Sequence, residues 1–60
     1  MAQVVSKGRT RSVRWDKSSK KIYLEDHRFF KNMVDIGIKA DSEVQAIVIA
    51  KEYLDLHPSF

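Results

Sequence analysis

The sequence predicts an α+β fold in which a short β-ribbon or hairpin is followed by two helices, assembled as a dimer. Apolar and polar residues alternate over residues 11–16 and again over 20–25, which is typical of half-buried strands. Apolar residues then recur at helical spacing over 26–36 and 42–56. The chain has only 60 residues and no cysteine. A domain this small without disulfides commonly relies on oligomerisation, so we expect one domain over 1–60 that forms a homodimer.

The two expected strands join through a turn-like stretch at residues 16–19. If they pair as a hairpin around this four-residue loop, Val13 lies opposite Ile22. The buried face then carries four apolar side chains, Val13, Trp15, Ile22 and Leu24. The exposed face carries Arg14, Lys21 and Tyr23. Residues 1–10 lack periodicity and contain Gly8, which predicts a flexible basic arm.

Two helices are expected after the second strand. Asp26 is a suitable N-cap for the first, and its apolar stripe comprises Phe29, Phe30, Met33 and Val34. Gly37 stands where a glycine commonly ends a helix. The second helix is expected to start at Ser42, with Gln45 three residues later as in a capping box, and to end near Leu56 before Pro58.

The second expected helix is apolar around most of its circumference, which requires burial on nearly all sides. One small sheet cannot enclose such a helix, so we expect it to pack against its copy across a two-fold axis. The expected dimer core comprises Val44, Ile47, Val48, Tyr53 and Leu54. The β-branched residues 47–49 leave a strand as the alternative, but the capping residues favour the helix.

Charge is strongly polarised along the chain. Residues 1–21 hold seven basic groups and one acid, whereas residues 22–60 hold four basic groups and seven acids. A basic segment on an acidic scaffold indicates a polyanionic partner, and a two-stranded ribbon fits the major groove of duplex DNA. A solvated basic tail without a partner is the alternative. The candidate nucleic-acid-binding residues are Lys7, Arg9, Arg11, Arg14, Lys20, Lys21, Tyr23 and Ser42.

The order of strand 20–25, helix 26–36, a Gly37-Ile38 turn and a capped helix 42–56 resembles the ribbon-helix-helix family of DNA-binding repressors. The stretches DIGI, SEV and KEYL are similar to that family's turn, second-helix start and helix ending. The resemblance implies an intermolecular ribbon in which Lys21 and Tyr23 read bases, while Ser42 and the amides of Glu43 and Val44 hold a phosphate. Residues 11–16 are an addition to this pattern, either paired within the chain or part of a flexible arm.

These observations predict a cytoplasmic, dimeric transcriptional repressor or regulator and no enzyme. No phosphate loop and no nucleophile beside a base is recognisable, and the spacing of His27 and His57 is not that of metal ligands, so we expect neither cofactor nor metal. The longest apolar run is too short to span a membrane. Two other partners remain open: RNA, with Trp15 and Tyr23 as stacking platforms, and an acidic protein surface.

Overall fold

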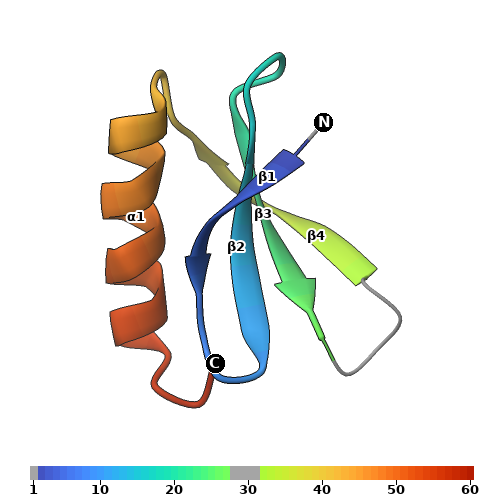
Figure 1. Cartoon of the computed structure of the whole chain (residues 1–60), viewed down its shortest axis with the longest axis vertical. Coiled ribbons are helices and arrows are strands. Elements are labelled where there is room, and N and C mark those ends of the chain that lie inside the picture. Colours follow the sequence, from blue (N-terminus) through green and yellow to red (C-terminus); the bar gives the residue numbers. More distant parts are fainter. Residues whose placement is uncertain (1, 28–31) are drawn as a thin grey trace.

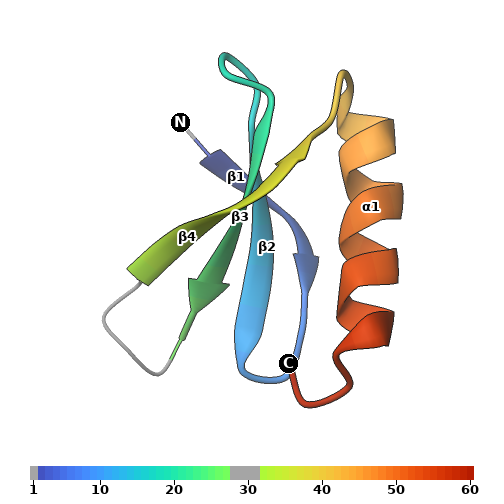
Figure 2. The same ribbon diagram turned by 180° about the vertical axis from the view of Figure 1, so that it is seen from behind.

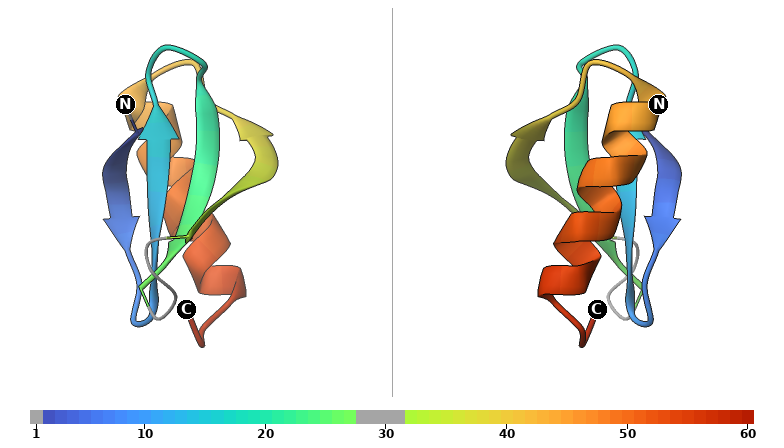
Figure 3. Two further views of the ribbon diagram at one scale, coloured as in Figure 1. Left: turned by 90° about the vertical axis from the view of Figure 1, so that its right-hand side faces the viewer. Right: turned by 90° about the vertical axis from the view of Figure 1, so that its left-hand side faces the viewer.

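The computed structural model describes residues 2–27 and 32–60, which form a four-stranded antiparallel sheet with one helix packed on one face (Figures 1 and 2). The strands are connected in the order β1-β2-β3-β4. Figure 3 shows the two layers, with the helix behind the sheet in one view and in front of it in the other. The elements are β1 (Ala2–Lys7), β2 (Arg11–Asp16), β3 (Lys21–Asp26), β4 (Asn32–Lys39) and α1 (Glu43–Leu56).

The expected β-ribbon with two helices is therefore wrong, because residues 32–39 of the expected first helix and its connection form strand β4. Residues 28–31, with two phenylalanines of the expected helical stripe, lie outside the described residues. The alternation of Val34, Ile36 and Ile38 suits a strand, and it outweighs the helical spacing of the preceding residues. Gly37 does not end a helix; it has a φ of 77° within β4. There the pairing with β3 is irregular, as in a β-bulge.

The hairpin within the chain is confirmed, with β2 and β3 antiparallel. Its register differs from the expected one by two residues. Val13 lies opposite Leu24 instead of Ile22, and Trp15 lies opposite Ile22. A slip of two residues preserves the face on which each side chain lies. The face assignment made from the sequence therefore holds: Val13, Trp15 and Ile22 are buried, and Leu24 packs against them.

Residues 2–7, expected in a flexible arm, instead form the edge strand β1 and pair with β2. The pairing contains an irregularity between Val4 and Ser6. Val5 packs against the core, while Val4 is exposed. Val5 therefore attaches the strand to the core by an apolar contact, although apolar and polar residues do not alternate regularly along β1. The bulge interrupts the alternation because it changes the direction of successive side chains.

Helix α1 begins as the sequence predicts. The Ser42 side chain caps it by accepting a hydrogen bond from the Gln45 amide at 3.2 Å. The Gln45 side chain in turn accepts from the Asp41 amide at 3.0 Å, one residue earlier than in a standard capping box. The helix packs mainly on β1 and β2 through the fully buried Ala46 and Ala50, whose small side chains allow a close approach to the sheet.

The core lies between the sheet and α1. Val13 and Ile22 are completely buried, and Trp15 is 4% exposed. The Trp15 indole Nε1 donates a hydrogen bond to the Ala40 carbonyl at 3.0 Å, so its one polar group is satisfied inside the molecule. This bond ties β2 to the connection between β4 and α1, and it leaves the indole unavailable as a stacking platform for bases.

Candidate nucleic-acid interface

Three of the sequence-predicted cations lie on the central strands β2 and β3, and each of them faces a carboxylate. Arg11 pairs with Asp26 at 3.4 Å, and Lys21 pairs with Asp35 at 3.8 Å. Each pair joins neighbouring strands: Arg11 and Asp26 lie opposite each other on β2 and β3, while Lys21 on β3 reaches Asp35 on β4. These partners reduce the positive charge that the two side chains offer to a phosphate.

Arg14 is the third paired cation, and its contacts are structural. Its Nε lies 3.2 Å from Glu25 Oε1, without the geometry of a hydrogen bond. Its Nη1 donates to the Ala2 carbonyl at 2.9 Å. Glu25 is only 6% exposed, so its charge requires a close cation. Arg14 therefore neutralises a buried carboxylate and ties β1 to β2 and β3.

The same sheet face contains a serine beside a histidine. The Ser12 hydroxyl lies 2.6 Å from His27 Nε2, a separation that suits a nucleophile and its base. Ser12 is only 2% exposed, however, so a substrate carbonyl has no access to its oxygen. The contact links β2 to the end of β3 and satisfies a buried hydroxyl.

Tyr23 lies on this sheet face opposite Arg14 and Asp35. Arg14 and Lys21, which share the face, are matched by Glu25 and Asp35. A face with balanced charge gives little long-range attraction for a polyanion. Base reading by Lys21 and Tyr23 therefore remains a prediction that the electrostatics of the face do not support.

The start of α1 lies at the same end of the molecule as the β2–β3 turn. A cavity of about 500 Å³ there is lined by Gln3, Trp15, Lys17, Lys20, Asp41, Ser42 and Glu43. Its two lysines are balanced by two carboxylates, and Lys20 lies 3.9 Å from Asp41. The Ser42 hydroxyl already caps the helix. The expected phosphate contact at Ser42 stays a prediction.

The opposite end of the molecule has an excess of positive charge. A cavity of about 450 Å³ lies between the β1–β2 turn, the last turns of α1 and the segment that follows the helix. Its lining includes three cations, Lys7, Arg9 and Lys51, and one acidic side chain, Asp55. Within residues 2–27 and 32–60, none of the three cations has a carboxylate partner within salt-bridge distance.

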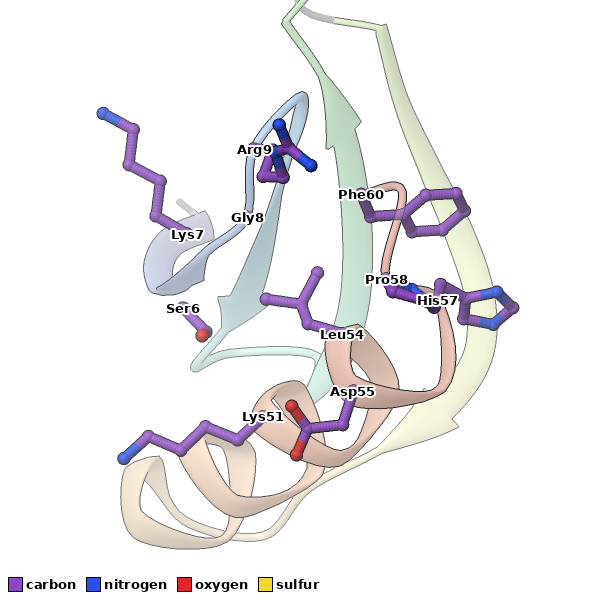
Figure 4. Close-up of a pocket in the computed structure, with 10 residues that line it drawn as sticks. All are labelled: Ser6, Lys7, Gly8, Arg9, Lys51, Leu54, Asp55, His57, Pro58 and Phe60. Carbon is purple, nitrogen blue, oxygen red and sulfur yellow. The ribbon is translucent and has the colours of Figure 1, made fainter.

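Figure 4 shows how the side chains around this cavity lie. Lys7 from β1 and Lys51 from α1 lie at opposite edges of the cavity and extend away from each other, and Ser6 lies between them. Leu54 points into the cavity. We call Ser6, Lys7, Arg9 and Lys51 the turn–helix surface. Lys51 was missed as a site residue, because it lies in the acidic part of the sequence and only the fold brings it beside the basic segment.

The segment after α1 fixes the β1–β2 turn. The Phe60 carbonyl accepts hydrogen bonds from the amides of Thr10 and Arg11, at 2.6 and 3.2 Å. Gly8 lies so close that a Cβ there would fall 2.7 Å from the Phe60 carbonyl carbon. Residues 8–11, which carry Arg9, are thus held against the end of the chain rather than projecting freely.

In the part of the chain that the structure describes, no helix is long and apolar enough to span a membrane. Among the same residues, no cluster of potential ligands is suited to a metal ion. The resemblance to ribbon-helix-helix repressors is wrong, because residues 2–27 and 32–60 form four strands and one helix and because no protein family model matches the chain. Comparison with curated proteins and with solved structures likewise found no match.

Proposed function

We propose that this protein is a non-catalytic DNA-binding protein that contacts the phosphate backbone through its turn–helix surface. The observation that carries the proposal is the division of the cations into two groups. Arg11, Arg14 and Lys21 face carboxylates on the sheet. Lys7, Arg9 and Lys51 line one cavity that has a single acidic side chain, Asp55.

The electrostatics of DNA binding explain why this division matters. A cation gains affinity for DNA when it replaces the counterions condensed on phosphates. A lysine or arginine already paired with a carboxylate must first give up that partner, so it gains less. Because the unpaired cations lie on two different elements, their positive charge is spread over an area of the protein surface. Such a surface suits a charged strand better than a single small anion.

A homodimer remains part of the proposal, now with a different geometry. The expected dimer core is divided in the single chain: Leu54 packs against the core, whereas Val44 and Val48 are 73% and 52% exposed. The two valines are four residues apart, so they lie on one side of α1. Pairing of this side with its copy would place two turn–helix surfaces in one particle and increase its avidity for DNA.

Two double variants of equal charge test the DNA-binding proposal. Lys7→Ala/Arg9→Ala removes two cations of the turn–helix surface. Lys17→Ala/Lys39→Ala removes two exposed cations elsewhere. Affinity for duplex DNA is measured by fluorescence anisotropy over a range of salt concentrations. The first variant should bind more weakly, with a salt slope smaller by about 2 per chain, and so by about 4 for a dimer, since each phosphate contact contributes about 0.9. The second should bind nearly as the parent chain does.

Three outcomes would contradict the proposal in different ways. Equal losses for the two variants would mean that net charge, not this surface, controls binding. Stronger binding to RNA or single strands than to duplex DNA would change the class of nucleic acid. Absence of binding to every nucleic acid by a folded parent chain would direct attention to an acidic protein partner.

A further inference from the structure

We propose that α1 pairs with α1 of a second copy in antiparallel orientation, with Val44 against the partner's Val48 and Lys51 against the partner's Asp41. This inference rests on the homodimer of the proposed function and deepens it, because it gives the orientation, the register and the ion pairs of the interface. The exposed side of α1 is thus assigned to a second copy of this chain.

The exposed side of α1 carries one continuous row of four residues: Val44, Val48, Lys51 and Asp55. Their spacing of four, three and four residues is that of the a and d positions along one seam of a coiled coil. All four are exposed, whereas the opposite side of the helix packs on the sheet. Such a row suits contact with a second helix through its apolar half.

The charges in this row select the antiparallel orientation. In a parallel pair equivalent residues face each other, so Lys51 would meet the partner's Lys51 and Asp55 would meet the partner's Asp55. Like charges placed together across an interface are unfavourable. An antiparallel pair centred between Val44 and Val48 avoids both contacts and brings the four valines of the two chains together.

The same register supplies a carboxylate for Lys51. Lys51 lies three residues after Val48, and Asp41 lies three residues before Val44. Both are therefore at similar distances from the centre, about 7 Å along the helix axis, and a two-fold axis places each lysine beside the partner's Asp41.

Both members of this ion pair are available. Within residues 2–27 and 32–60, Lys51 has no carboxylate within salt-bridge distance. The side chain of Asp41 is 87% exposed and lies 3.9 Å from Lys20. An exposed contact of this kind contributes little, so Asp41 can exchange it for a lysine of the partner.

Antiparallel pairing separates the task of Lys51 from that of Lys7 and Arg9. Lys51 extends away from Lys7 (Figure 4), so it serves the interface while the other two cations stay at the β1–β2 turn. This turn lies beside the last turns of α1. The two β1–β2 turns of the dimer therefore lie at opposite ends of the paired helices, where they contact separate phosphate groups of one duplex.

Disulfide cross-linking tests the orientation, because the chain has no cysteine of its own. Val44→Cys and Val48→Cys chains, one of them carrying a tag that changes its size, are mixed and oxidised at micromolar concentration. We expect the mixed disulfide in clear excess over the self-linked species, since disulfides form only between Cα atoms that lie close together. An excess of self-linked chains would indicate a parallel pair, and absence of cross-linking would remove the interface. Either result overturns the inference.

Exchange of the two charges tests the register. Lys51→Asp should raise the dissociation constant of the dimer about 10-fold, as measured by sedimentation, because it removes both ion pairs and brings like charges together. Adding Asp41→Lys should restore most of the loss. Lys17→Asp makes the same change of charge in the β2–β3 turn and should leave dimerisation unchanged. Circular dichroism establishes that each variant is folded, and a loss without rescue in folded variants would overturn the register.

The outcomes separate this inference from the DNA-binding function. If the mixed disulfide and the charge rescue are observed but duplex DNA does not bind, the antiparallel interface stands and the DNA-binding function fails. If DNA binds through Lys7 and Arg9 while neither the mixed disulfide nor the rescue is observed, the interface is overturned and the DNA-binding function stands.

Discussion

The guanidinium of Arg11 lies 4.0 Å from the centre of the Phe60 ring, so the first residue of β2 contacts the last residue of the sequence. The same guanidinium pairs with Asp26 at 3.4 Å, and the ring stacks on His57 with centroids 4.7 Å apart. Three separate segments of the chain thus meet at one arginine. This contact closes the end of the molecule at which the turn–helix surface lies.

Phe60→Ala should destabilise the fold by about 1–3 kcal/mol, because it removes the cation–π contact and the partial burial of an aromatic ring. The backbone hydrogen bonds to the Phe60 carbonyl remain in this variant. Urea unfolding followed by Trp15 fluorescence measures the change. Ser59→Ala, at an exposed position, should stay within about 0.5 kcal/mol of the parent chain. Equal effects of the two substitutions would mean that the ring contributes nothing.

The two glycines should respond differently to the same substitutions. At Gly8, a Cβ would fall 2.8 Å from the Arg11 carbonyl oxygen, so alanine and asparagine should both cost about 1–3 kcal/mol through steric conflict with backbone. At Gly37 nothing lies near the Cβ position, and the strain comes from the φ of 77°. There alanine should cost about 1 kcal/mol, and asparagine less, since it tolerates positive φ. Equal tolerance of alanine and asparagine at Gly37 would contradict this division.

Stability should depend on pH through the β2–β3 turn. The hydroxyl and the amide of Ser18 donate to Asp16 Oδ1 at 2.7 and 2.9 Å, and these bonds hold the pKa of Asp16 below its ordinary value of 3.8. Because the folded pKa is the lower one, the stabilisation is present above the unfolded pKa. It is lost as the pH falls through the folded pKa.

Ser18→Ala should accordingly raise the pKa of Asp16, as measured by NMR titration of its carboxyl carbon. The variant should be less stable than the parent chain at neutral pH, and the difference due to this carboxylate should vanish below the folded pKa. Ser19→Ala is the control, since only the backbone of Ser19 bonds to Asp16. A difference in stability that is the same at every pH would assign the effect of Ser18 to something other than this carboxylate.

The homodimer can be tested without disturbing the core. Val48→Asp places a charge on the exposed side of α1, where Val48 is 52% exposed, so each chain should stay folded while a dimer separates. Sedimentation at micromolar concentration should give a dimer for the parent chain and a monomer for the variant. Met33→Asp, also at an exposed apolar position but on β4, should remain dimeric. A folded monomer in the parent chain would remove the dimer from the proposal.

The sequence by itself determined the local elements whose patterns are complete within a few residues. Alternation specified the β2–β3 hairpin and its buried face, because a period of two is visible within one strand. The capping pair of Ser42 and Gln45 specified the start of α1. For β4, the helical spacing of apolar residues before residue 35 conflicted with the alternation after it. Whether this segment forms a helix or a strand depended on the edge of β3, with which β4 pairs. Local patterns do not contain that information.

Only the tertiary structure decided which cations remain available. In the sequence, residues 7–21 form one basic run, and nothing in it distinguishes Arg9 from Arg14. Folding places Arg14 beside the buried Glu25 and leaves Arg9 beside a cavity that also receives Lys51, 42 positions later. Charge interactions depend on distances in space and on burial. The sequence therefore indicated a polyanion as the partner, while the fold selected the residues proposed to meet it.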